Sequence, residues 1–234
     1  MENINIKGVQ QTSLIDYPGN IVSTIFLSRC NFRCPFCHNP ELVLDQVEED
    51  IPPEEVIDFL EDKKKWLDGI CITGGEPTLH KGLPEFIKKV KSLGMKVKLD
   101  TNGTNPEMLS GLLSMNLLDY VSMDIKASPE NYPDVTKVRV NMDKVRESIK
   151  LLQQSNIEHE FRTTVIPGHF DAKEAEAIGS LLRGSGKYFL QQYRNSDKVL
   201  EQEYQNIEPY LADKFEEFRT ILLKYIENVE IRGV

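Results

Sequence analysis

The fold class is decided by residues 96–126, which run KVKLDTNGTNPEMLSGLLSMNLLDYVSMDIK. A short strand-like segment at 96–101 is followed by Asn105-Pro106-Glu107, which offers a capping side chain, proline at the first helical position and an acid in the first turn. Residues 106–115 then predict a helix, and residues 120–126 predict a second strand. Two strands joined by one helix are expected to run parallel with a right-handed crossover.

The same alternation extends in both directions from this unit. Further strands are expected at 21–28, 70–73, 158–166 and 187–192, and further helices at 53–66, 83–93, 142–154, 172–182 and 209–226. Six βα units are fewer than the eight of a closed barrel. The sequence therefore predicts an α/β fold, an incomplete parallel (β/α)6 barrel with one open side.

The domain organisation expected from this pattern is a single domain over residues 1–234, since no linker composition interrupts it. Within it, residues 1–20 form an N-terminal extension, residues 21–195 the partial barrel core, and residues 196–234 a closing helix and tail. The extension carries a turn at Pro18-Gly19.

Amino-acid composition indicates which classes of partner are unfavourable and in which cellular compartment the protein is expected. The chain has 28 Lys and Arg against 37 Asp and Glu, a formal net charge of −9. That balance argues against nucleic acid or an anionic membrane as the main partner. No apolar run approaches the ~18 residues of a membrane span, and the N-terminus lacks a signal-peptide pattern. A cytoplasmic protein is expected, in which four cysteines favour metal binding or catalysis over disulfides.

Polar residues and glycines gather where the predicted strands end. In parallel barrels the loops at this edge build the active site. This clustering predicts an enzyme, and the positions concerned are Cys30, Gly74-Gly75-Glu76-Pro77, Asp100-Thr101-Asn102-Gly103, Asp124 with Lys126, and Pro167-Gly168.

Three cysteines, Cys30, Cys34 and Cys37, share the first of these loops. Each thiolate can reach one iron of a cubane cluster, whereas a fully ligated [4Fe–4S] cluster needs four ligands. The fourth cysteine, Cys71, lies inside an apolar strand and is predicted to be a buried small hydrophobe. The cluster would then keep one iron open for chemistry, which makes the three cysteines both metal ligands and catalytic residues.

Two other metal-site interpretations remain open. Cys30, Cys34, Cys37 and His38 supply the ligand types of a Cys₃His zinc site, although the adjacent Cys37 and His38 are awkward to aim at one ion. A non-catalytic zinc or iron–sulfur scaffold is the alternative from another functional class. A scaffold has no use for the polar residues at the other strand ends.

The pattern Cys-x-x-x-Cys-x-x-Cys, with Phe36 before the last cysteine and Gly74-Gly75-Glu76-Pro77 after the next strand, resembles the radical S-adenosylmethionine (SAM) superfamily. Three further segments, His38-Asn39-Pro40, Asp100–Gly103 and Met123–Lys126, resemble the glycyl-radical-enzyme activases. Ser13–Gly19 resembles the corresponding segment in activating proteins of anaerobic ribonucleoside-triphosphate reductase.

This resemblance implies a [4Fe–4S] cluster and S-adenosylmethionine as cofactors. It also implies that an electron from the cluster cleaves S-adenosylmethionine to methionine and a 5′-deoxyadenosyl radical. It implies a glycyl radical enzyme as partner, anaerobic ribonucleoside-triphosphate reductase in the closest match, and a flavodoxin or ferredoxin as external electron donor. The alternative within the superfamily is an enzyme acting on a small metabolite or peptide, for which Gln191, Gln192 and Arg194 are the candidate specificity residues.

The resemblance also assigns roles to residues near the cysteines. Phe36 is expected beside the adenine edge. Gly74 and Gly75 are expected to let the backbone approach the methionine portion of the cofactor. Glu76 is expected to accept a hydrogen bond from the cofactor's ammonium group. Ile166 belongs to an apolar segment expected to pack against adenine.

The remaining assignments concern charged and polar positions. Asp100 and Thr101, with Asn102 of the same motif, are expected near the cofactor, and the resemblance implies a monovalent cation beside Asp100. The family often has methionine where this chain has Ser122. Asp124 and Lys126 share one strand face and are expected to meet ribose hydroxyls and a carboxylate, or to form a structural ion pair. Two outcomes remain open for Arg162, a contact with a carboxylate and an exposed strand end.

Overall fold

The computed structural model describes residues 3–234, which form one eight-stranded sheet in the order β1 to β8. The strands are β1 (Ile6–Ser13), β2 (Val22–Leu27), β3 (Gly69–Gly74), β4 (Lys96–Thr101), β5 (Tyr120–Asp124), β6 (Glu158–Val165), β7 (Lys187–Gln192) and β8 (Asn228–Arg232). The helices are α1 (Pro40–Val43), α2 (Pro53–Lys63), α3 (Leu83–Ser92), α4 (Pro106–Ser114), α5 (Tyr132–Thr136), α6 (Met142–Gln154), α7 (Ala172–Leu181) and α8 (Ala212–Leu222).

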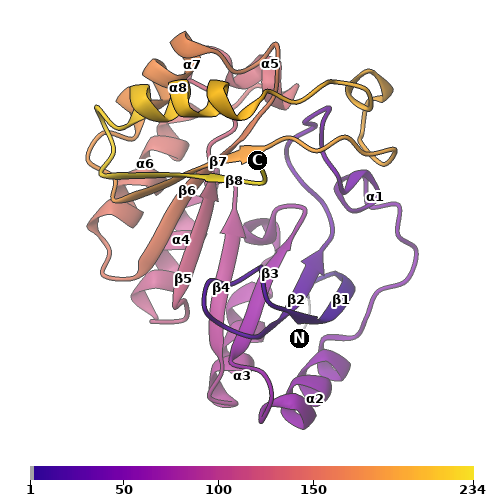
Figure 1. Ribbon diagram of the computed structural model, residues 1–234. Helices are drawn as coiled ribbons and strands as arrows, with labels where there is room; N and C mark the ends of the chain where they lie inside the picture. The colour runs from indigo at the N-terminus through magenta and orange to yellow at the C-terminus, as the bar shows by residue number, and fades with distance from the viewer. Residues whose placement is uncertain (1–2) are drawn as a thin grey trace.

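Strands β2 to β8 run parallel, and β1 pairs antiparallel with β2. The sheet curves, and its outer face is covered by helices (Figure 1). Over residues 3–234 the two edge strands, β1 and β8, do not pair with each other. The predicted open, incomplete parallel barrel is confirmed.

The sheet extends past the predicted core of residues 21–195 at both ends. β1 lies in the predicted N-terminal extension, and β8 lies in the predicted C-terminal tail. β8 has only five residues, so alternation alone is too weak to identify it. Its strand conformation depends on pairing with β7, where Tyr188 lies opposite Val229.

The side chains before α4 and α7 cap the first turns of these helices, as the sequence predicted for Asn105. The Asn105 side chain accepts a hydrogen bond from the Met108 amide at 3.2 Å, and Pro106 occupies the first turn of α4. Asp171 caps α7 in the same way, through the Glu174 amide at 2.8 Å. Such caps satisfy amides that have no partner within the helix.

Aromatic and charged side chains from distant segments close the end of the barrel at which the parallel strands begin, and we call this end the base. Tyr17, in the loop between β1 and β2, packs its ring against Tyr120 with centroids 5.6 Å apart. Glu160, which is 1% exposed, accepts hydrogen bonds from Tyr120 and Ser122 at 2.8 Å. Arg232 of β8 contacts both Glu160 oxygens, at 2.9 and 2.8 Å. The C-terminal strand is therefore bound to the barrel interior by a bidentate ion pair.

We expect Arg232→Ala to lower the free energy of unfolding by about 2–3 kcal/mol, because Glu160 would stay buried with a charge that has lost its counter-ion. An anaerobic urea titration followed by circular dichroism measures the change. Arg219→Ala is the control, because Arg219 also contacts β8, through the Val229 carbonyl at 2.9 Å, without neutralising a buried acid. Equal effects of the two substitutions would contradict the importance of the ion pair.

None of the helices within residues 3–234 has the length and apolar character that crossing a membrane requires.

Candidate active site

A cavity of about 260 Å³ opens at the C-terminal ends of the parallel strands. Its wall brings together residues from strands β3 to β7 and from the loop of residues 28–39, which carries the three cysteines and which we call the cysteine loop. It includes twelve sequence-predicted site residues, namely Cys30, Cys34, Phe36, Cys37, Gly74, Gly75, Glu76, Asp100, Thr101, Asn102, Asp124 and Lys126. Residues separated by almost a hundred positions therefore share one site.

The cysteine loop presents three thiols to this cavity. A turn closes between Cys34 and Cys37, whose amide donates to the Cys34 carbonyl at 3.0 Å. The Phe32 amide lies 3.4 Å from the Cys30 sulfur and donates to it. Cys71 has no exposed surface and is absent from the cavity wall. The structure thus separates the three loop cysteines from the fourth, as the sequence predicted.

This donor set fits a cluster better than a single ion. Among residues 3–234, no three His, Cys, Asp or Glu side chains converge on a position for one metal ion. His38 is exposed and its ring lies 5.8 Å from that of Tyr193. A cubane cluster needs one thiolate at each of three separate irons, so thiols spread around a cavity suit it. Cys30, Cys34 and Cys37 are the residues that would hold it.

Burial controls the protonation of these thiols in the metal-free protein. It raises the pKa of Cys30 to about 12 and that of Cys34 to about 11, and it raises the pKa of Cys37 as well. The positive charge of Lys126 opposes the shift at all three sulfurs. Iron binding must therefore displace protons, which links cluster assembly to pH.

The two glycines after β3 are required by close backbone packing. A Cβ on Gly75 would lie 1.9 Å from the Arg29 carbonyl oxygen, and one on Gly74 would lie 2.4 Å from that of Leu27. Gly74 also has a φ of +112°, which disfavours other residues. The glycines thus hold the end of β3 against the start of the cysteine loop. Their expected contact with the cofactor stays a prediction.

Glu76 connects two of the loops that form the cavity. Its carboxylate is 1% exposed and accepts hydrogen bonds from the Asn102 amide and the Thr101 hydroxyl, each at 2.7 Å. It also accepts from the amide of Thr78 at 3.1 Å. Burial raises the pKa of Glu76, and these donors oppose that shift. Glu76 therefore fixes Asp100–Gly103 relative to Gly74–Pro77, whatever contact it makes with the cofactor.

We expect Glu76→Gln to cost about 1–3 kcal/mol of folding stability, because an amide nitrogen would face a donor where an oxygen now accepts. S-adenosylmethionine affinity should fall with it as the two loops loosen. Urea unfolding and equilibrium binding measure the two effects. Glu85→Gln, at an exposed position of α3, is the control and should change neither.

Beside Glu76 lies a chain of alternating charges, which we call the charge chain and which consists of Lys98, Asp100, Arg162, Asp124 and Lys126. Arg162 of β6 contacts Asp100 at 3.0 Å and also pairs with Asp124. Lys98 pairs with Asp100, and Lys126 contacts Asp124 at 2.9 Å. The pairing register of β5 and β6, which sets Asp124 opposite Arg162, produces this arrangement.

These ion pairs lower the pKa values of both acids, Asp100 and Asp124. The Arg162 and Lys98 cations outweigh burial and hold the pKa of Asp100 below its usual value. Arg162 and Lys126 do the same for the pKa of Asp124. Both carboxylates are therefore ionised, and the three cations leave the charge chain with one net positive charge.

Some sequence-predicted positions lie outside the cavity wall, among them Ile166 and Ser122. Ile166 is 1% exposed and belongs to the hydrophobic core, not to the cavity wall. Ser122 lies opposite Asp100 in the pairing of β4 with β5, and its hydroxyl donates to Glu160 at 2.8 Å. The segment Ser13–Gly19 is also remote, since Tyr17 lies at the base of the barrel.

Sequence reasoning missed several residues of the site. Thr164 and Gln191 line the cavity from the ends of β6 and β7. Lys98 was missed entirely, although its spacing of two from Asp100 places both side chains on one strand face. Of the three late-strand specificity candidates only Gln191 lines the cavity, because the Gln192 side chain donates to the Tyr210 carbonyl at 3.1 Å.

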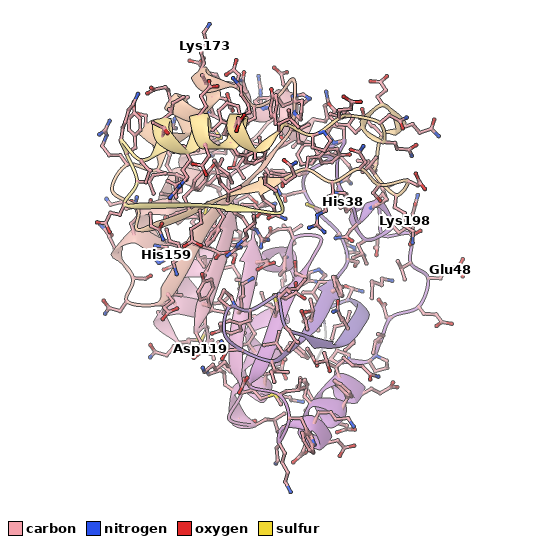
Figure 2. The ribbon with its side chains drawn as sticks, in the orientation of Figure 1. His38, Glu48, Asp119, His159, Lys173 and Lys198 are labelled. Atoms are coloured by element: carbon pink, nitrogen blue, oxygen red, sulfur yellow. The ribbon has the colours of Figure 1, made fainter. Side chains whose placement is uncertain are left out.

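Residues 193–211, in which the sequence predicted a role for Arg194 alone, lie against the cysteine loop beside α1 (Figure 1). The Glu201 amide donates to the Pro35 carbonyl at 2.9 Å. The Tyr204 ring lies 6.3 Å from that of Phe36, and its hydroxyl is hydrogen-bonded to His169 at 2.6 Å. Figure 2 shows His38 near this segment, with Asp119 at the opposite end of the strands.

The model of the radical SAM superfamily matches residues 24–180, which include the cysteine loop and strands β3 to β6. This chain belongs to the radical SAM superfamily. Within the superfamily, a candidate glycyl-radical enzyme activating enzyme of Methanocaldococcus jannaschii is 34% identical over 237 residues, covering 98% of this chain and 96% of that protein. The pyruvate formate-lyase-activating enzyme of Clostridium pasteurianum is 27% identical, covering 72% and 71%.

Solved structures support the same fold. Streptococcus suis SuiB, in a crystal structure with bound S-adenosylmethionine, superposes with a TM-score of 0.65 over 89% of this radical SAM chain. The sequence identity is 14%, and this chain spans about half of SuiB, 52% of its length. The similarity shows a shared barrel architecture.

Proposed function

We propose that this radical SAM protein is an activating enzyme that generates a glycyl radical on a partner enzyme, anaerobic ribonucleoside-triphosphate reductase. The general activity is supported by two relatives named as glycyl-radical enzyme activating enzymes, one of which matches almost the whole chain, and by a pyruvate formate-lyase-activating enzyme. The reductase as partner is supported by the segment Ser13–Gly19.

The observation that carries the proposal is one cavity lined by the three loop cysteines and by four members of the charge chain, namely Asp100, Asp124, Lys126 and Arg162. The family implies a [4Fe–4S] cluster and S-adenosylmethionine, which together supply one-electron cleavage of a carbon–sulfur bond and a radical able to abstract hydrogen. The protein's task is to bind and orient these cofactors and to exclude water from the site.

The cavity residues suit that task. Lys126 and Arg162 place cationic groups in the cavity wall, where they favour binding of a carboxylate. Asp124 holds both cations in position. Phe36 adds an apolar surface that is covered from outside by Tyr204. Fixed charges in a site with restricted water interact more strongly than they would in bulk solvent.

The open side of the barrel supports a polypeptide substrate. β1 and β8 remain unpaired with each other within the described part of the chain, so the sheet does not enclose the site completely. Hydrogen abstraction requires the glycine Cα to come within about 3–4 Å of the radical carbon. The unpaired side gives a loop of the partner enzyme room to approach.

The electron is proposed to come from a flavodoxin or ferredoxin. Three of the four cysteines are placed in the cavity, and the fourth, Cys71, is buried away from it. The chain therefore offers ligands for one cluster, which supports an external donor.

The test is anaerobic reconstitution of the cluster, reduction in the presence of S-adenosylmethionine, and addition of a candidate anaerobic reductase. We expect 5′-deoxyadenosine together with a glycyl signal in the electron paramagnetic resonance spectrum. Deoxyadenosine without a protein radical on any glycyl radical enzyme would refute the activase. It would favour action on a small metabolite or peptide, for which Gln191 in the cavity wall is the supporting observation.

A further inference from the structure

Lys98 is a buried lysine that takes part in the site without reaching the cavity wall. It lies on β4 two residues before Asp100, on the same face of the strand. Its side chain is 3% exposed and its ammonium pairs with Asp100. The only other contact described for its ammonium within residues 3–234 is the Cys71 sulfur at 3.7 Å.

The burial of the Lys98 ammonium group needs a physical explanation. Burying an ammonium group is costly, and a methionine of similar length would fill the space without that cost. The ion pair with Asp100 offsets the cost but does not explain why both charges are present. A charge that acts on the neighbouring site does explain it, because Asp100 lines the cavity and Lys98 lies directly beneath it.

The charge chain leaves no suitable place for a monovalent cation at Asp100. Each of the four oxygens of Asp100 and Asp124 already contacts one protein cation, supplied by Lys98, Arg162 or Lys126. An added cation would join a group that already carries one net positive charge. The neighbouring Ser122 hydroxyl donates to Glu160 at 2.8 Å, and the hydrogen bond occupies it. The residues present therefore do not fit the cation that the family resemblance implied.

We propose that the Lys98 ammonium is a built-in cation that replaces a monovalent metal ion beside Asp100. It holds the Asp100 carboxylate and leaves the charge chain with the positive charge that receives the carboxylate of S-adenosylmethionine. Lys98 is thus a positioning residue, since it acts through Asp100 and Arg162. The inference rests on the superfamily's cofactor and is independent of the glycyl radical partner.

The test measures the dissociation constant of S-adenosylmethionine for the anaerobically reconstituted enzyme in potassium, sodium or choline chloride. At constant ionic strength, which keeps screening equal, the wild type should vary by less than about twofold. Lys98→Met should bind about tenfold more weakly in choline chloride, the loss of one charge-assisted contact. Potassium should restore much of that affinity, because the freed Asp100 oxygen can then accept the ion.

Lys96→Met is the matched control, because Lys96 is exposed on the same strand and contacts Asn20 at 2.9 Å. It should behave as the wild type in every salt, as should Lys98→Arg. Weaker binding by the wild type in choline would overturn the proposal, and so would a Lys98→Met enzyme without potassium rescue. If Lys98→Met does not fold, the wild-type salt series and Lys98→Arg still decide.

Because binding is measured without a partner protein, failure of this inference is distinguishable from failure of the activase proposal. A cation-independent enzyme that forms no glycyl radical would refute the partner and leave the role of Lys98 intact. A cation-dependent enzyme that does form the radical would do the reverse.

Discussion

Cys34→Ala is expected to abolish cluster assembly and S-adenosylmethionine cleavage together. The substitution leaves two thiols in the cavity, and two ligands cannot hold three irons of a cubane. Iron and sulfide content after anaerobic reconstitution should fall to background, as should 5′-deoxyadenosine. Cys34 is 7% exposed and fits a small side chain, so alanine should be accommodated without unfolding.

Cys71→Ala is the matched control for that experiment. Cys71 has no exposed surface, lies outside the cavity wall, and packs with Tyr17, Val22 and Tyr120 at the base of the barrel. The variant should keep full iron and sulfide content while losing some stability from the missing sulfur. Loss of the cluster in this variant would mean that the open iron position was assigned wrongly.

Arg162→Met is expected to cost about 3 kcal/mol or more, because one substitution breaks two partly buried ion pairs. The Arg162 side chain is 19% exposed, and its partners Asp100 and Asp124 are 12% and 24% exposed. For a chain of this length the melting temperature should fall by roughly 10 °C. Binding of S-adenosylmethionine should weaken as well, because the charge chain would lose its net positive charge.

Arg146→Met is the control for this prediction. Arg146 and Asp143 form an exposed pair on α6, with side chains 50% and 90% exposed. Pairs of this kind contribute about 0–1 kcal/mol. If the two arginine substitutions changed the unfolding free energy equally, the charge chain would have no special part in stability.

The sequence predicted the parts of the site that lie within single loops. Cys30, Cys34 and Cys37 fall within eight residues, so chain connectivity alone brings their thiols together. The placement of Gly74–Pro77 and Asp100–Gly103 followed from the parallel topology, because the ends of parallel strands meet at one edge. Asp124 and Lys126 followed from the period of two along a strand.

The partners of those residues were beyond sequence reasoning. Arg162 was assigned two possible environments, and the pairing register of β5 and β6 decided between them. Glu76 was expected at the cofactor, and the structure adds its role in joining two loops. Period-two alternation shows which face a side chain occupies but not which residue it meets there.

The sequence by itself determined the parallel α/β architecture, the cysteine loop and the superfamily, because each depends on residues close together in the chain. Only the tertiary structure decided the charge chain, the place of Lys98, the pairing of β8 and the covering of the cysteine loop by residues 193–211. Arg162 and Asp100 are 62 positions apart, and Arg232 and Glu160 are 72 apart. Contacts of that separation depend on strand register and packing, and neither is encoded in a local pattern.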